Sequence, residues 1–373
     1  MPFVIMKDSL RWHVFLLLKA LLIFLLLALG IVFFIFPTEV ELLEKYKTIS
    51  FEHYYPIFSD ERDEAYHALK YALANGQIVL FGSSELSQYD SSFIPYNFFS
   101  ESLGIPVYGF GHAGFQARAI ETELLASVTQ NAIDNGKIVI LISPSWFIEG
   151  TGTNESLWKK EILTTTMSSR IRENKFANGY FKQNIDFEKN DKYTDNLDRL
   201  IVKIIDTYFL WSMSFEKPKN EIFTDLKWSE LKIDAQKIET SKSTNQFGIN
   251  DEYFDEYIKS LVGTEKFPLK IKGPPRVEDN KEVKDFESLL QILSKFKVRP
   301  IFIMLPLNKK AYSNTIELNP TISYLAEKIK KEGYPYLDMW SQPFEPGVMT
   351  DVMHLGEYGL MLINEFIDQN LKK

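Results

Sequence analysis

Residues 77–85 read Gln-Ile-Val-Leu-Phe-Gly-Ser-Ser-Glu, an apolar run that ends in a glycine and two serines. An apolar run without polar alternation is typical of a strand buried on both faces, the kind found in parallel sheets. The glycine permits a tight turn, and the serines indicate the start of a helix. This stretch therefore predicts a buried strand whose carboxyl end presents a serine hydroxyl, with Ser84 better placed than Ser83.

Similar apolar runs recur along the chain and alternate with segments of helical spacing. The further strands are expected at 106–110, 137–142, 299–305 and 334–339, and helices at 59–75, at 115–135 and from about Leu355. This alternation indicates right-handed βαβ units and a parallel sheet with helices on both faces. The expected fold class is α/β.

Residues 143–298 separate the third and fourth expected strands, and such a length exceeds what a loop in a compact domain requires. Helical apolar spacing occurs within it at 156–176 and 196–215. We therefore expect an α-helical insertion at about 151–275, acting as a cap over the sheet.

An apolar segment near the N-terminus predicts a membrane anchor. Residues 14–36 read VFLLLKALLIFLLLALGIVFFIF, long enough to span a bilayer as a helix. Basic residues precede this segment and glutamates follow it, so the positive-inside rule places residues 1–13 in the cytoplasm and 37–373 outside. A cleaved signal peptide is the alternative, but the run is long and ends in large residues rather than small ones.

Composition narrows the chemistry. The formal net charge of −8 gives no basic footprint for nucleic acid, and the absence of cysteine excludes thiolate chemistry and disulfides. No EF-hand, HExxH, Walker or dinucleotide-binding pattern occurs, so we expect neither a metal nor a cofactor. Only five histidines are present, which makes the search for a catalytic base short.

A nucleophilic serine needs a base, and Asp351-Val352-Met353-His354 supplies one. A carboxylate three residues before a histidine can orient the imidazole so that its other nitrogen faces the serine. Both segments follow expected strands, and the carboxyl ends of parallel strands meet at one edge of a sheet. We therefore expect Ser84, Asp351 and His354 to act together in acyl transfer.

Other residues at the same edge are candidates for substrate contacts. The backbone N–H of Gly114, in the second loop, is an expected oxyanion donor together with that of Ser84, and Ser83 lies beside them. Trp146 and Phe147 follow the third strand and either line a pocket or fix the cap onto the sheet. His112 is a competing base, although a role in shaping the pocket is favoured.

These features together resemble the DltD family of membrane-anchored, SGNH-hydrolase-like proteins of D-alanyl-lipoteichoic acid biosynthesis. The resemblance rests on the N-terminal anchor and four motifs, which are VLFGSSEL at 79–86, ISPSWF at 142–147, LPLN at 305–308 and DVMHLG at 351–356. It implies a three-layer flavodoxin-like fold and a triad of Ser84, Asp351 and His354. Serine hydrolases of the SGNH class carry an oxyanion-hole asparagine after the third strand, whereas this chain has Ser-Pro-Ser-Trp-Phe there, as the family does.

The resemblance also implies a pathway. A single-pass cell-membrane protein would transfer D-alanine through an ester on Ser84 to teichoic or lipoteichoic acid outside the cell. The implied partners are a membrane-bound O-acyltransferase (DltB-like), a small acyl-relay peptide (DltX-like), possibly a D-alanyl carrier protein, and the polymer acceptor. Two alternatives stay open, which are an O-acetyltransferase or acyl esterase for another cell-surface polysaccharide, and a non-catalytic scaffold for the acyltransferase or carrier.

Overall fold

The computed structural model describes most of the chain. The described residues are 3–35, 51–57, 62–87, 92–128, 136–148, 158, 162–174, 177, 192–213, 269–271, 276–296, 298–309, 311–342 and 348–371. Much of the expected insertion at about 151–275, including 214–268, lies outside them. The residues divide into two compact units, Met1–Ser50 with Leu200–Pro218, and Phe51–Arg199 with Lys219–Lys373.

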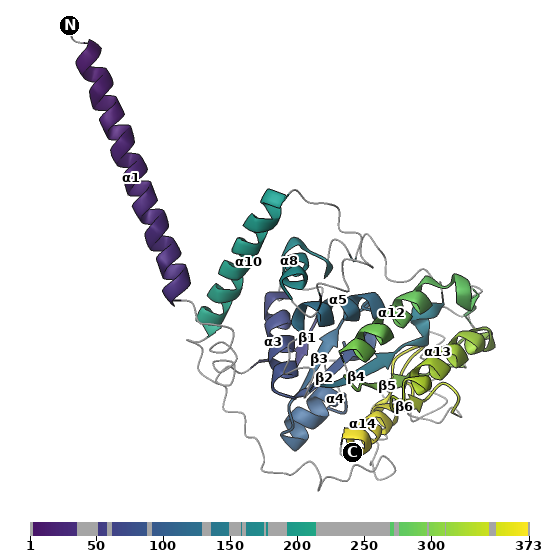
Figure 1. Ribbon diagram of the computed structural model, residues 1–373. Helices are drawn as coiled ribbons and strands as arrows, with labels where there is room; N and C mark the ends of the chain where they lie inside the picture. The colour runs from purple at the N-terminus through teal and green to yellow at the C-terminus, as the bar shows by residue number, and fades with distance from the viewer. Residues whose placement is uncertain are drawn as a thin grey trace. The chain divides into compact units, whose positions relative to one another are not determined.

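The second unit contains a parallel sheet of six strands (Figure 1). Its strands are β1 (Tyr54–Tyr55), β2 (Ile78–Gly82), β3 (Val107–Gly111), β4 (Lys137–Ile142), β5 (Ile301–Met304) and β6 (Tyr336–Asp338). Their order is β1-β3-β2-β4-β5-β6, and every pairing is parallel. Without β1, the order is that of flavodoxin-like sheets, so the expected α/β class with a parallel sheet is confirmed.

Helices cover both faces of this sheet (Figure 1). One side carries α3 (Arg62–Ala74), α5 (Ala117–Ser127), α12 (Lys281–Lys295) and α13 (Asn319–Lys331), and α5 contacts both α3 and α12. The other side carries α4 (Pro95–Asn97), the π-helical turn η2 (Phe98–Ser102) and α14 (Glu357–Leu371). The same unit holds α8 (Thr165–Glu173), which packs on α5.

Alternate residues of each strand supply the two cores, as expected for a strand buried on both faces. Leu80 and Ile303 join one hydrophobic cluster with Ile363 of α14. Phe302, next along β5, instead meets Phe286 of α12 edge-on, with ring centroids 5.8 Å apart. The strand ends are thus fixed from both sides, which holds the loops at the carboxyl edge in place.

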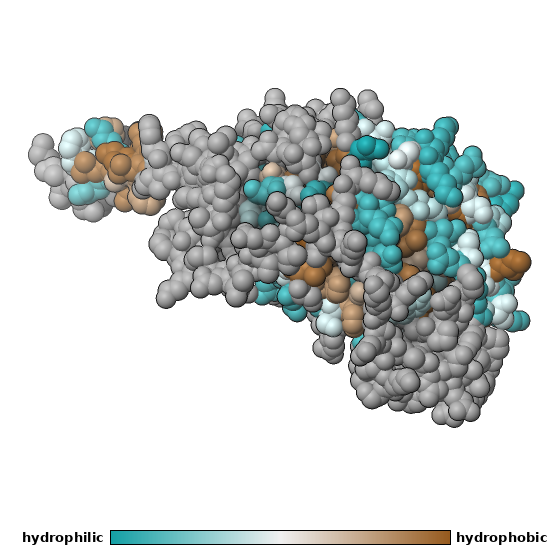
Figure 2. Space-filling view, turned by 90° about the horizontal axis from the view of Figure 1, so that it is seen from below, coloured by the Kyte–Doolittle hydropathy of each residue, from teal (hydrophilic) through white to brown (hydrophobic). Residues whose placement is uncertain are grey.

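The first unit contains α1 (Phe3–Ile35) and most of α10 (Lys192–Met213). Side chains of α1 are described at residues 12–27 and 30, and their surface is largely hydrophobic (Figure 2). Within the described part of the chain, no helix is both long and apolar enough to cross a membrane. The membrane span at 14–36 therefore stays a prediction.

Candidate active site

Two glycines shape the turn after β2. Gly82 ends β2 and lies in register with Gly111 at the end of β3. A Cβ atom on Gly111 would lie 2.1 Å from the carbonyl oxygen of Gly82, so no larger residue fits at this approach. A Cβ atom on Gly82 would meet Oε1 of Glu85 at 2.9 Å. The turn that follows β2 is therefore packed directly against backbone.

Ser84 begins a single 3-10 turn, η1 (Ser84–Leu86), and its side chain is half-buried. The sequence predicts the start of a helix here, but the structure has only a turn of three residues, which carries almost no macrodipole. Among the described residues, the N–H of Ser84 has no hydrogen-bond acceptor. This N–H group therefore remains available to an oxyanion.

The loop before α14 carries Asp351 and His354. Oδ1 of Asp351 accepts the backbone N–H groups of Met353 at 2.8 Å and of His354 at 2.7 Å. Oδ2 of Asp351 lies 2.6 Å from Nδ1 of His354. The carboxylate thus folds its own loop and orients the imidazole, which is the arrangement that the spacing of three residues predicts.

The imidazole reaches across to the β2 turn, where Nε2 of His354 lies 3.0 Å from Oγ of Ser84. Burial alone would raise the pKa of Asp351, but the hydrogen bond and charge of His354 and two backbone N–H groups hold it below the usual value. Asp351 is therefore ionised and accepts the Nδ1–H proton, which leaves Nε2 of the neutral imidazole as an acceptor for the serine hydroxyl.

The pKa of His354 is shifted in the opposite direction. Burial lowers it, but the hydrogen bond and charge of Asp351, together with the charge of Glu85, outweigh burial and raise the pKa above its usual value. A raised pKa makes the imidazole a stronger base toward the serine proton. The three residues form one hydrogen-bonded chain from carboxylate to hydroxyl.

Ser83 joins the β2 turn to the loop after β3. Its hydroxyl donates to the carbonyl oxygen of His112 at 3.2 Å and accepts the N–H of Gly114 at 3.2 Å. Gly114 has φ +85°, a conformation that favours glycine. The expected oxyanion donor Gly114 is thus occupied by Ser83, and His112 enters the site through its carbonyl group.

Trp146 and Phe147 lie in a short 3-10 turn, η3 (Pro144–Phe147), after β4. Both side chains are buried, and Asn280, the N-cap of α12, donates to the carbonyl oxygen of Phe147 at 3.1 Å. These contacts favour the packing interpretation of the two residues, and a contact with substrate stays a prediction.

Two further residues to which the sequence analysis gave no role support the site, Asn308 of the LPLN motif and Tyr54. The buried Asn308, after β5, donates from Nδ2 to the carbonyl oxygen of Asp351 at 3.1 Å and from its N–H to that of Val352 at 3.2 Å. Tyr54 of β1 donates to the carbonyl oxygen of Gly111 at 2.8 Å. The sequence could have indicated the role of Asn308, because it follows a buried strand at the carboxyl edge of the sheet. Nothing in the sequence indicates the role of Tyr54.

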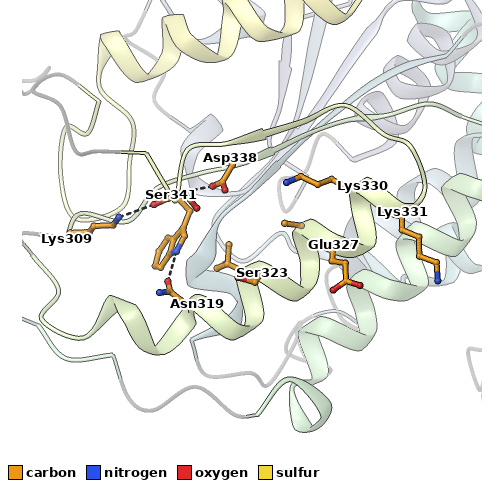
Figure 3. A pocket seen from close by; sticks show the side chains of 11 residues that line it. Lys309, Asn319, Ser323, Glu327, Lys330, Lys331, Asp338 and Ser341 are labelled. Atoms are coloured by element: carbon orange, nitrogen blue, oxygen red, sulfur yellow. Dashed lines mark hydrogen bonds between the residues drawn. The ribbon is translucent and has the colours of Figure 1, made fainter.

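A cavity of about 870 Å³ lies beside α13 and the end of β6 (Figure 3). Its lining includes Lys309 and the buried Trp340, whose carbonyl oxygen accepts from Nζ of Lys309 at 3.0 Å. Ser84, Asp351 and His354 do not line this cavity. It is therefore distinct from the candidate active site.

Comparison with known proteins places the chain among DltD sequences. The family model described as "DltD protein" matches residues 58–217 and 211–372. Protein DltD of Bacillus subtilis (strain 168) is 25% identical over 335 residues, which cover 79% of this chain and 82% of that protein. Protein DltD of Staphylococcus aureus (strain NCTC 8325 / PS 47) is 22% identical over 343 residues, covering 83% of each.

Proposed function

This chain belongs to the DltD family, and we propose that it is a serine-dependent acyltransferase in the D-alanylation of teichoic acids. The family supports a general role in D-alanyl transfer. The observation that carries the serine mechanism is the chain of hydrogen bonds from Asp351 to His354 at 2.6 Å and from His354 to Ser84 at 3.0 Å.

The first half of the proposed reaction loads the serine. Oγ of Ser84 attacks the carbonyl carbon of an activated D-alanyl ester or thioester while Nε2 of His354 takes the hydroxyl proton. The negative charge on the carbonyl oxygen is stabilised by the N–H of Ser84. The bond to the leaving group then breaks, and the leaving group receives the proton from His354.

The second half transfers the acyl group to the polymer. A polyol hydroxyl gives its proton to His354 and attacks the ester on Ser84, and collapse of the intermediate returns the proton to Oγ of Ser84. Asp351 stays ionised throughout and stabilises the imidazolium that forms in each half. Ser83 holds the loop that contains Gly114 against the nucleophile turn.

The proposed location is the outer face of the cell membrane. Residues 14–36 would anchor the chain as a single helix with a cytoplasmic N-terminus, and 37–373 would lie outside. A DltB-like membrane-bound O-acyltransferase, a DltX-like relay peptide and a D-alanyl carrier protein are the proposed sources of the acyl group.

The test is Ser84→Ala in cells, with Ser83→Ala as the matched control. We expect Ser84→Ala to abolish ester-linked D-alanine on the envelope polymer at an unchanged protein level, and Ser83→Ala to reduce it less. Normal D-alanine content with Ser84→Ala would remove the serine mechanism and favour a scaffold. Loss of polymer-linked acetate instead would favour the O-acetyltransferase or esterase alternative.

A further inference from the structure

We propose that Glu85 is a positioning residue of this active site, whose buried carboxylate folds the turn that carries Ser84 and places a second negative charge near His354. This inference deepens the function proposed above and rests on it where activity is measured. Neither the strand pattern nor the motif that contains Ser84 assigns Glu85 a role.

The first argument is the burial of Glu85, which is 4% exposed. Glutamate is almost never fully buried unless its charge is compensated, and a glutamate in a turn of the sequence is ordinarily solvated. Oε1 of Glu85 accepts the N–H of Ser83 at 2.6 Å. The N–H of Ser83 is thereby occupied, while that of Ser84 has no acceptor among the described residues and is available to an oxyanion.

The second argument is that the surroundings fit a carboxylate at this place. A Cβ atom on Gly82 would lie 2.9 Å from Oε1 of Glu85 and from Cγ of Leu86, so a larger residue at 82 would displace these side chains. The buried Tyr96 donates to the carbonyl oxygen of Leu86 at 2.9 Å and closes the turn from the other side. The carboxylate is therefore buried within the turn that contains Ser84 and does not extend into solvent.

The third argument is the electrostatic link to His354. Burial raises the pKa of Glu85 to about 7, against the effect of its backbone hydrogen bonding and the charge of His354. The charge of Glu85 in turn raises the pKa of His354, as does Asp351 from the same loop as His354. Asp351 and Glu85 are the charged groups that act on this imidazole among the described residues. Both therefore stabilise the imidazolium that acyl transfer generates.

The first experiment measures the titration of His354 in the full chain by NMR of the histidine Cε1–H groups. Glu85→Gln keeps the size and the acceptor of the side chain but removes its charge, so the pKa of His354 should fall by several tenths to about one unit. Glu121→Gln is the matched control, because Glu121 is also buried with a pKa of about 7 but is bonded to Ser288 in the helical layer. It should leave His354 unchanged.

The second experiment follows acylation of Ser84 by p-nitrophenyl acetate as a function of pH. We expect Glu85→Gln to move the acid limb of the pH–rate profile to lower pH, with a plateau rate within about threefold of the wild type. Glu85→Ala should lower kcat at least about tenfold with little change in KM. If Glu85→Ala does not fold, the Glu85→Gln profile and NMR titration decide.

The proposal would be overturned if His354 titrated in Glu85→Gln as it does in the wild type and the two pH–rate profiles coincided. The NMR titration needs no turnover, so it distinguishes this inference from the proposed function. If p-nitrophenyl acetate still acylated a Ser84→Ala variant, the proposed serine mechanism would be wrong. The electrostatic link between Glu85 and His354 would be unaffected by that result.

Discussion

The turn after β2 and the loop before α14 are built on the same device, a carboxylate that accepts backbone N–H groups of its own segment. In the loop, Asp351 accepts those of Met353 and His354, and in the turn Glu85 accepts that of Ser83. Each carboxylate thereby folds a few residues and presents one functional side chain, the imidazole in one case and the hydroxyl in the other.

The two carboxylates differ in their charge state, because their partners differ. Asp351 is partly exposed and bonds the imidazole directly, so its pKa is held below the usual value. Glu85 is fully buried with only backbone donors, and burial raises its pKa to about 7. The hydrogen bond and charge of His354 keep Asp351 ionised, whereas burial leaves Glu85 about half-ionised near neutrality although its N–H donors act in the opposite direction.

The largest effect is expected where the two segments meet. His354→Ala should lower acyl transfer on the order of 10⁴-fold or more, and adding Ser84→Ala should lower it little further, because the two residues act as one unit. Steady-state rates with p-nitrophenyl acetate measure this. Additive losses in the double variant would contradict the joint action of the two segments.

A smaller loss should follow from removing the charge of Asp351 while keeping its shape. Asp351→Asn should reduce kcat roughly 10³–10⁴-fold, because the amide can donate to Nδ1 and favours the wrong tautomer of His354. Glu85→Gln, the equivalent change in the β2 turn, should cost far less, because Glu85 does not bond the imidazole. Equal losses of kcat from Asp351→Asn and Glu85→Gln would contradict the different roles assigned to the two carboxylates.

A methyl group placed where β3 approaches β2 should destabilise the fold more than one placed in open space. Gly111→Ala should destabilise the fold by about 3 kcal/mol or more, because its Cβ would lie 2.1 Å from the carbonyl oxygen of Gly82. Gly333→Ala is the control, since Gly333 has φ +75° with open space around it, and backbone strain alone should cost about 1 kcal/mol. Denaturant unfolding measures both, and similar midpoints would show that the close approach of the strands is not needed.

The smallest effect is a pH dependence that belongs to the turn alone. The pKa of Glu85 is raised from 4.5 to about 7 in the folded chain, so its protonated form is favoured and stability is lost as pH rises between these values. Glu85→Gln lacks this loss. The difference in unfolding free energy between this variant and the wild type should therefore move in favour of the variant by on the order of 2 kcal/mol from about pH 4 to about pH 8. A difference in unfolding free energy that does not vary with pH would contradict the titration.

The sheet could be predicted where strands are long and apolar. The run at 137–142 coincides with β4, and the runs at 299–305 and 334–339 contain β5 and β6. The edge strand β1 has two residues and therefore no period to detect. The helix expected at Ser84 proved to be a single 3-10 turn, η1 (Ser84–Leu86).

The convergence of Ser84, Asp351 and His354 could be predicted, because strand order and the carboxyl-edge rule bring their segments together. The occupation of Gly114 by Ser83 could not, because it depends on ångström-scale positions of two loops. Glu85 was missed for a related reason. A glutamate in a turn looks solvated in a sequence, and only the packed structure shows it buried.

The hydrogen bond between Ser84 and His354 joins residues 270 positions apart in the chain. The nucleophile is therefore synthesised well before its base, which lies in the loop before α14 (Glu357–Leu371). A growing chain carries Ser84 without its base until the segment with Asp351 and His354 has been made. The order of synthesis thus delays activation of the serine until its base has been made.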